Sequence, residues 1–257
     1  MKVNVECAGV EYGHHTALDG VTFDVGEGEV VSMVGPNGSG KSTLIKCIAQ
    51  IHSPTRGRIL LNGRNASKLA PAEISKLIGY VPQNYHYLFF STVMETVMLG
   101  RKPHIRWRVS RHDLDVVQQS LDYLNIGHLA DKFMDQLSGG EKQKVYIARA
   151  LAQEPELFLF DEPTSNLDLK HQIDVLEITR ALTRTSGKSM IIALHDLNLA
   201  YTYSDRIVML NRGKIHASGK PEEVLTPENI RSVYGVDSLI VESGYGRHIV
   251  PLKAKTV

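Results

Sequence analysis

The sequence predicts an α/β fold with a mainly parallel sheet, an antiparallel β part at the amino terminus and an inserted α-helical part. Short strand-like runs with brief, glycine-containing connections fill residues 1–35, and such connections favour antiparallel pairing. Apolar strand-like runs then alternate with helical segments, which is typical of a parallel sheet covered by helices. Residues 85–140 show helical spacing instead, so we expect this stretch to be an insertion into the sheet domain.

The first half contains four predicted strands, VNVECAGVEYG, LDGVTFDVGEG, EVVSMVG and RGRILLNG. A glycine-rich turn and the helical pattern KSTLIKCIAQI follow EVVSMVG, and together they predict a strand–loop–helix unit. PAEISKLIGYVPQ predicts a short helix and then a strand. In the insertion, STVMETVMLGR and SRHDLDVVQQSLDYLNI predict helices on either side of the turn-rich linker KPHIRWRVS.

The second half begins with LSGGEKQKVYIARALAQ, in which a Gly-Gly turn opens a predicted helix. Strand LFLF, helix LDLKHQIDVLEITRALTRT and strand SMIIALH follow, and RIVML and KIHASG add two more strands. A predicted helix, PENIRSVY, and a strand-like run, DSLIVES, close the chain.

Composition excludes several protein classes. The chain has 257 residues, of which 42% are apolar and 22% charged, the balance of a soluble globular protein. The formal net charge of +1 gives no general basic field, so we expect no nucleic-acid partner. Two cysteines cannot build a disulfide framework or a four-ligand zinc site. No apolar run is long enough to span a bilayer, and the first residues lack the pattern of a signal peptide.

A phosphate-binding loop is the strongest local motif. GPNGSGKST, residues 35–43, fits G-x-x-x-x-G-K-[ST] and lies between an apolar strand and a helix. Glycines let successive N–H groups point at one anion, and the helix start adds its positive end. Lys41 can reach the β- and γ-phosphates, and the Ser42 hydroxyl can ligate Mg²⁺. The alternative is a glycine-rich turn with a capping serine, which would not require both the apolar strand before the motif and the helix after it. The predicted nucleotide-binding residues are Gly35, Pro36, Asn37, Gly38, Ser39, Gly40, Lys41, Ser42 and Thr43.

Two other apolar strands end in candidate catalytic residues. LFLFDEP ends in Asp161, which would hold the metal, and Glu162, which could polarise the attacking water as a general base. Two solvent-facing carboxylates at a strand end are the alternative. SMIIAL is followed by His195 in the position of a γ-phosphate sensor, although a lone histidine more often has no chemical role.

LSGGEKQ, residues 137–143, discriminates among proteins with a phosphate loop. Ser138, Gly139 and Gly140 begin a helix and so provide a second anion-binding helix start. A single nucleotide does not need two anion-binding helix starts from the same chain. It can use both if one helix start comes from each of two protomers. A serine N-cap with a glycine pair is the alternative.

Residues 35–43, Gln83, 137–143, 157–163 and His195 resemble, in order, the motif set of the ATP-binding-cassette (ABC) ATPases. The resemblance spans nearly the whole chain and implies a P-loop, RecA-like core that hydrolyses ATP with Mg²⁺. It implies catalytic roles for Lys41, Gln83, Glu162 and His195, and metal ligation by Ser42, Gln83 and Asp161. It adds nucleotide contacts by Tyr12, Ser138, Gly139, Gly140 and Asp168.

For three of these residues the resemblance implies a specific contact or position. The family's Q-loop glutamine, Gln83 here, touches Mg²⁺ or the attacking water, and Asp168 in SNLD would lie near a dimer seam. Tyr12 would stack on adenine, with a strand tyrosine in the core as the alternative. The motif LSGGE has Glu141 where the commonest family form has glutamine, and we expect activity to survive this departure.

The segments 92–104, 161–177, 194–215 and 221–236 resemble the branch serving importers of ferric siderophores, haem, cobalamin and related oxyanions. The alternatives are an exporter cassette and a non-transport regulatory cassette. A P-loop kinase or GTPase would lack LSGG, and a two-cassette factor would need a second phosphate loop.

The resemblance implies a head-to-tail dimer of two copies, each ATP lying between one phosphate loop and the partner's residues 138–140. The partners would be permease subunits and, indirectly, a substrate-binding protein, which places the chain at the cytoplasmic face of the membrane. Tyr85, His86, Tyr87 and Leu88 are candidates for the permease contact, with packing inside the helical part as the alternative. We expect an ATPase domain over 1–236, with a core at 1–84 and 141–220, a helical part at 85–140, and an extension at 221–257.

Overall fold

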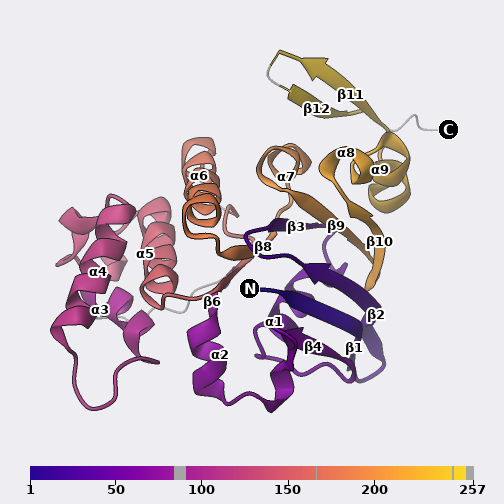
Figure 1. Ribbon diagram of the computed structural model, residues 1–257. Helices are drawn as coiled ribbons and strands as arrows, with labels where there is room; N and C mark the ends of the chain where they lie inside the picture. The colour runs from indigo at the N-terminus through magenta and orange to yellow at the C-terminus, as the bar shows by residue number, and fades with distance from the viewer. Residues whose placement is uncertain (84–90, 166, 245, 253–257) are drawn as a thin grey trace.

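A computed structural model describes residues 1–83, 91–165, 167–244 and 246–252. Figure 1 shows two sheets beside one another, with a group of helices at one end and a small β-hairpin at the other. The α/β class, the antiparallel amino-terminal strands and the inserted helices were all predicted by the sequence, and the structure confirms them.

The first sheet is antiparallel and has the order β2-β1-β4-β5. Val3 of the first strand pairs with Val25 on one side and with Leu61 on the other, and register shifts along β1 mark bulges. Its strands are β1 (Val3–Tyr12), β2 (His15–Val25), β4 (Arg56–Leu61) and β5 (Arg64–Asn65).

The second sheet has the order β10-β9-β3-β8-β7-β6. Neighbours from β9 to β6 are parallel, and β10 runs antiparallel to β9. The three central strands are buried throughout, as their continuous apolar runs require. The strands are β3 (Val30–Val34), β6 (Ile78–Val81), β7 (Leu157–Asp161), β8 (Ser189–Ala193), β9 (Arg206–Asn211) and β10 (Lys214–Gly219).

Helices cover both faces of this sheet. On β7, Leu157 and Leu159 belong to the core shared with α1 (Lys41–Ile48) and the antiparallel sheet, whereas Phe158 and Phe160 belong to the core on the other face. That second core includes α6 (Leu169–Ser186) and α7 (Leu197–Tyr203). The short helix α2 (Pro71–Leu77) leads into β6 at the sheet edge.

The helical group contains α3 (Val93–Met98), η2 (Leu99–Arg101), α4 (Arg111–Tyr123), η3 (Gly127–Leu129), η4 (Met134–Gln136) and α5 (Gly139–Ala152). Thr92, Ser110 and Ser138 cap α3, α4 and α5 through capping boxes. α5 packs against α3 and α4 and also contacts β6. The sequence predicted a turn at Gly139 and Gly140, but the helix already begins at Gly139 because Ser138 supplies its N-cap.

The chain closes with α8 (Pro221–Val224), α9 (Pro227–Tyr234) and a hairpin of β11 (Ser238–Ser243) and β12 (Gly246–Pro251). The second hairpin strand was not predicted. Asn198 of α7 fixes the hairpin, since its amide accepts from the Ile249 N–H at 2.7 Å and donates to the Ile249 carbonyl at 3.2 Å. Within the described ranges, no helix combines the length and apolarity needed to cross a bilayer.

Candidate functional site

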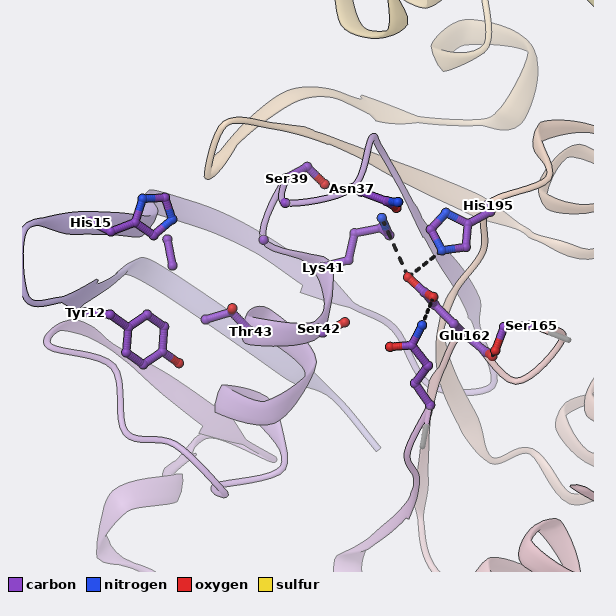
Figure 2. Close-up of a pocket in the computed structure, with 14 residues that line it drawn as sticks. Tyr12, His15, Asn37, Ser39, Lys41, Ser42, Thr43, Glu162, Ser165 and His195 are labelled. Carbon is purple, nitrogen blue, oxygen red and sulfur yellow. Dashed lines mark hydrogen bonds and ion pairs between the residues drawn. The ribbon is translucent and has the colours of Figure 1, made fainter. Parts of the chain in front are cut away.

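A cavity of about 580 Å³ opens at the carboxyl ends of the parallel strands. β3, β6, β7 and β8 are parallel neighbours in one sheet, so the residues that follow them gather at the same edge. Figure 2 shows side chains from the two sheets facing one another across this cavity. It is lined by Tyr12, His15, Ala17, Asn37, Gly38, Ser39, Gly40, Lys41, Ser42, Thr43, Gln83, Glu162, Ser165 and His195.

The phosphate loop joins β3 to α1, and two of its glycines are required by crowding. A Cβ on Gly35, where φ is +149°, would stand 2.2 Å from the Leu210 carbonyl oxygen. A Cβ on Gly40, the N-cap of α1 at φ +106°, would stand 2.8 Å from the Ala17 carbonyl oxygen. Only glycine fits this close approach, which leaves the N–H groups at the start of α1 facing the cavity.

Polar groups in this loop match a phosphate ligand. Ser39 is almost fully buried, and its Oγ has no hydrogen-bond partner among the described residues. Lys41 donates from Nζ to the carbonyls of Gly35 at 2.9 Å and Pro36 at 3.3 Å. Burial lowers the pKa of Lys41, while the nearby carboxylates of Glu162 and Asp161 act to raise it. An anion in the cavity would supply partners for this lysine and this serine.

Ser42 and Asp161 provide hard oxygen donors at this edge of the sheet; Ser42 lines the cavity, whereas Asp161 is buried and is not a lining residue. The Ser42 hydroxyl donates to Oδ1 of Asp161 at 2.8 Å, which joins the first turn of α1 to the end of β7. Burial raises the pKa of Asp161, and the Ser42 hydrogen bond opposes that shift. Hydroxyl and carboxylate oxygens together with phosphate oxygens are the ligands that Mg²⁺ prefers, so these two residues fit that ion.

The Glu162 carboxylate is the meeting point of three predicted residues. Its side chain is 8% exposed; Oε1 lies 2.6 Å from His195 Nε2 and 3.9 Å from Lys41 Nζ. Gln83, which follows β6, donates its amide to Oε2. Figure 2 shows these contacts as dashed lines on the side of the cavity opposite Tyr12.

A strained turn aims Glu162 at the phosphate loop. Its φ of +53° lies in the left-handed region, which costs free energy for a residue with a side chain. The Glu162 carbonyl accepts from both the N–H and the Oγ of Ser165, at 3.1 and 2.9 Å, and these bonds hold the turn closed.

Tyr12 and His15 line the cavity from the antiparallel sheet. They pair across the tight turn between β1 and β2, and Figure 2 shows both at the far end from Glu162. The Tyr12 ring is not packed in the core: the residue is 49% exposed and its ring meets His52 edge-on at 6.2 Å. About half of the residue is therefore accessible from the solvent, and a stacking role requires such access.

The predicted residues Ser138, Gly139, Gly140 and Asp168 do not line this cavity. Ser138 caps α5, and its hydroxyl donates to Glu141 at 2.7 Å, so the residue that departs from the commonest motif closes a capping box. Asp168 caps α6 and lies 2.7 Å from Nδ1 of His171. A Cβ on Gly140 would stand 2.4 Å from the His171 ring, so the starts of α5 and α6 are in contact.

Sequence reasoning missed His15, Ala17, Ser165 and His171. Ser165 follows Glu162 by three residues, a spacing from which a turn could have been predicted. His15 and Ala17 line the cavity, and His171 contacts Gly140, because segments distant in sequence pack together. The proposed permease-contact residues Tyr85, His86, Tyr87 and Leu88 lie outside the described residues.

Known proteins that are similar to this chain are ATP-binding proteins of ABC transporters, as the residues of the site indicate. A family model for ABC transporters matches residues 18–165. An uncharacterised ABC transporter ATP-binding protein of Methanocaldococcus jannaschii is 47% identical over 234 residues, covering 90% of this chain and 91% of that protein. The ferric enterobactin transport ATP-binding protein FepC of Escherichia coli is 39% identical over 235 residues, covering 90% and 86%.

Solved structures match as well. One, described as an inward-facing conformation of a metal-chelate type ABC transporter, superposes with a TM-score of 0.87 at 32% identity, covering 98% of this chain and 97% of that one. A dimeric ATP-binding cassette in a post-hydrolysis state, bound to ADP and phosphate, gives 0.77 at 30% identity over 85% and 98%. This chain belongs to the ABC transporter family, and it is an ATP-binding, ATP-hydrolysing cassette of that family.

Proposed function

We propose that this chain energises an importer by hydrolysing ATP as one half of a head-to-tail dimer. The observation that carries the proposal is the position of Glu162, a carboxylate held by Lys41, Gln83 and His195 inside one cavity with the phosphate loop. A base placed beside the γ-phosphate position is what hydrolysis by an activated water requires.

In this proposal each residue has one task. The N–H groups of the phosphate loop and Nζ of Lys41 bind the β- and γ-phosphates. Glu162 accepts a hydrogen bond from the attacking water, while His195 and Gln83 orient the carboxylate and sense the γ-phosphate. Tyr12 stacks on the adenine. Ser42, Asp161 and Gln83 would hold Mg²⁺, which when bound neutralises phosphate charge.

The partner copy would complete each site. Ser138, Gly139 and Gly140 do not line their own chain's cavity, and a Cβ on Gly139 would meet no described atom within 4 Å. Glu141 of the same chain occupies the N–H and hydroxyl of Ser138, but the side of the helix start at Gly139 has room for an anion from the partner site. Asp168 begins the neighbouring helix and would lie at the same seam. A dimeric cassette bound to ADP and phosphate, and a second dimeric structure of the same cassette, support this arrangement.

A groove between the core and the helical group is the proposed permease site. It measures about 310 Å³ and includes the end of α1, helix α2, strand β6, η2 and α5. Ile51 and Leu99, both about half exposed, are among the residues that line it. Such apolar side chains in a groove suit a helix docked from a membrane subunit. This docking would keep the chain at the cytoplasmic face of the membrane.

The proposed cargo is a metal chelate such as a ferric siderophore, haem or cobalamin. Relatives named for ferric enterobactin, petrobactin, hemin and cobalamin import, all at least 37% identical, support this class. We further propose that residues 1–236 form the ATPase domain, with a core lobe at about 1–84 and 141–220 and a helical part at about 85–140. Residues 221–257 would form an extension.

Uptake into vesicles that contain this chain with its permease and binding protein tests the proposal. ATP inside the vesicles should drive uptake of at least one ferric siderophore, haem or cobalamin, and Lys41→Ala should abolish it. Efflux instead of uptake, or ATP hydrolysis that never moves any of the three cargoes, would contradict the importer assignment while leaving the ATPase assignment intact.

A further inference from the structure

A fully exposed tryptophan projects from the helical group. Trp107, the one tryptophan of the chain, is 97% exposed. It lies in the connection between η2 and α4, which we call the Trp107 loop (residues 102–110). An indole is large and apolar with one polar N–H, so its exposure to water is unfavourable and its burial at an interface is favourable.

The Trp107 loop is also strongly basic. Lys102, Arg106 and Arg108 belong to it, Arg111 follows it, and residues 102–112 contain no aspartate or glutamate. All four of these cations are exposed. In the described part of the chain, no ion pair involves any of them. Arg106 and Arg108 bracket Trp107 directly, which joins positive charge to an exposed aromatic ring.

The ends of the loop are fixed, so the tip is presented by the fold. Arg101, only 2% exposed, donates from Nε to Asp113 Oδ1 at 3.0 Å and from Nη1 to Glu154 Oε2 at 2.6 Å. Ser110 donates its N–H and hydroxyl to the same Asp113 carboxylate, which closes the other end. His104 Nε2 lies 3.0 Å from the Gln153 carbonyl and ties down the first part of the loop.

The loop begins where the proposed permease groove ends. Leu99 and Gly100 line that groove, and the Trp107 loop starts two residues later. Figure 1 shows this connection projecting beyond α3 and α4 at the lower left, on the side of the molecule that also carries α2. α2 contributes Ile74 and Ser75 to the same groove. A permease seated there would therefore bring the loop toward the membrane.

We propose that the Trp107 loop binds the headgroup region of an anionic phospholipid bilayer. Indole rings prefer the membrane–water interface, and Lys and Arg side chains are attracted to anionic headgroups within about a Debye length. The cations would hold the loop at the surface while Trp107 enters the headgroup layer. Only the place of this contact in an assembled transporter rests on the proposed function, because binding to a bilayer depends on the loop itself.

Fluorescence tests the proposal directly, because all tryptophan emission comes from Trp107. The purified chain is titrated with vesicles of equal parts phosphatidylglycerol and phosphatidylcholine, and with vesicles of phosphatidylcholine alone. Emission should move to shorter wavelength with the anionic vesicles only, and added salt should reverse the shift. Trp107→Ser should lose sedimentation with anionic vesicles and keep wild-type ATP binding.

Two double variants separate the loop from overall charge. Arg106→Ser with Arg108→Ser keeps the fluorophore and should weaken vesicle binding by ~10–30-fold, the factor expected for two interfacial cations. Lys214→Ser with Lys220→Ser removes the same charge from β10 and the start of α8 and should bind like wild type. No shift with anionic vesicles, or equal weakening by the two double variants, would overturn the proposal. The proposal would also be overturned if residue 107, in the assembled transporter, cross-linked only to the permease protein and not to lipid. ATP binding measured in parallel distinguishes these outcomes from a failure of the ATPase assignment.

Discussion

The ring of His171 fills the space in which a side chain on Gly140 would lie, since a Cβ there would stand 2.4 Å from His171 Cδ2. The same ring holds Asp168 through Nδ1 at 2.7 Å. One imidazole therefore connects the starts of α5 and α6, the two segments that the proposed dimer places against the partner's ATP.

Gly140→Ala should displace this ring and break its contact with Asp168. We expect a loss of about 1–3 kcal/mol in the free energy of unfolding, the usual cost of overpacking, together with weaker ATP-dependent dimerisation. Gly139→Ala is the matched control, because its Cβ would meet no atom of the described residues within 4 Å, and it should change the free energy of unfolding by under about 0.5 kcal/mol. Adding His171→Ala to Gly140→Ala should restore part of the lost stability in urea titrations. A Gly140→Ala chain as stable as the Gly139→Ala chain would contradict the crowding argument.

Asp113 should stabilise the fold in a pH-dependent way. Hydrogen bonds from Ser110 and then Arg101 lower the pKa of Asp113 to about 2, below its unfolded value of about 3.9. Its contribution is therefore complete above about pH 4 and is lost as the pH falls toward 2. Asp113→Asn should lower the free energy of unfolding by roughly 3 kcal/mol at neutral pH, because Arg101 loses a buried partner.

The difference between wild type and Asp113→Asn, measured by urea unfolding, should shrink as the pH drops below about 4. Asp115→Asn, at an exposed position of the same helix, serves as the control and should stay near wild type throughout. A difference between wild type and Asp113→Asn that grew on acidification would refute this assignment.

The sheet and the phosphate loop could be predicted because each strand, and the loop itself, is encoded by a contiguous stretch of the sequence. EVVSMVG, LFLF and SMIIAL are continuous apolar runs, and a fully buried parallel strand needs just that pattern. The phosphate loop is likewise a contiguous motif, although the crowding that requires Gly35 and Gly40 comes largely from Leu210 and Ala17 in other strands. Motif order along the chain was therefore enough for the fold and for the residues near the phosphates.

Contacts between distant segments could not be predicted in this way. His171 reaches Gly140 across 31 positions, and Arg101 reaches Glu154 across 53. Each looks like an ordinary polar residue of a helix until the helices are packed. β12 was missed because its sequence, GRHIVP, is short and half polar, and only its pairing with β11 reveals it.

Ser138→Arg should abolish hydrolysis although the chain's own phosphate loop is intact. A bulky cation at the start of α5 would block the approach of the partner's ATP in the proposed dimer. Mixing this chain with Lys41→Ala chains leaves one of the two composite sites free of both changes, so ATP binding at that site should return. Equilibrium binding of labelled ATP to the mixture measures this. If the mixture binds no more ATP than its separate components, the shared-site geometry is wrong.

Glu162→Gln should separate binding from chemistry. Glutamine keeps the shape and an acceptor oxygen, so contacts with Gln83 and the phosphate loop can persist, but it cannot take a proton from water. ATP affinity should stay near wild type while turnover falls by a factor on the order of 10²–10⁴, the usual contribution of a general base. With the γ-phosphate retained, the two chains should elute from a sizing column as a dimer with ATP and as a monomer with ADP.

Asp161→Asn is the matched variant for that experiment, because it changes the adjacent carboxylate in the same way. Asp161 accepts the Ser42 hydroxyl and is proposed to hold Mg²⁺, so this variant should weaken Mg²⁺-dependent ATP binding as well as turnover. Measured side by side, the two variants should therefore differ in affinity and agree in their loss of hydrolysis. Wild-type hydrolysis by Glu162→Gln, or equal loss of ATP binding in both, would show that Glu162 is not the base.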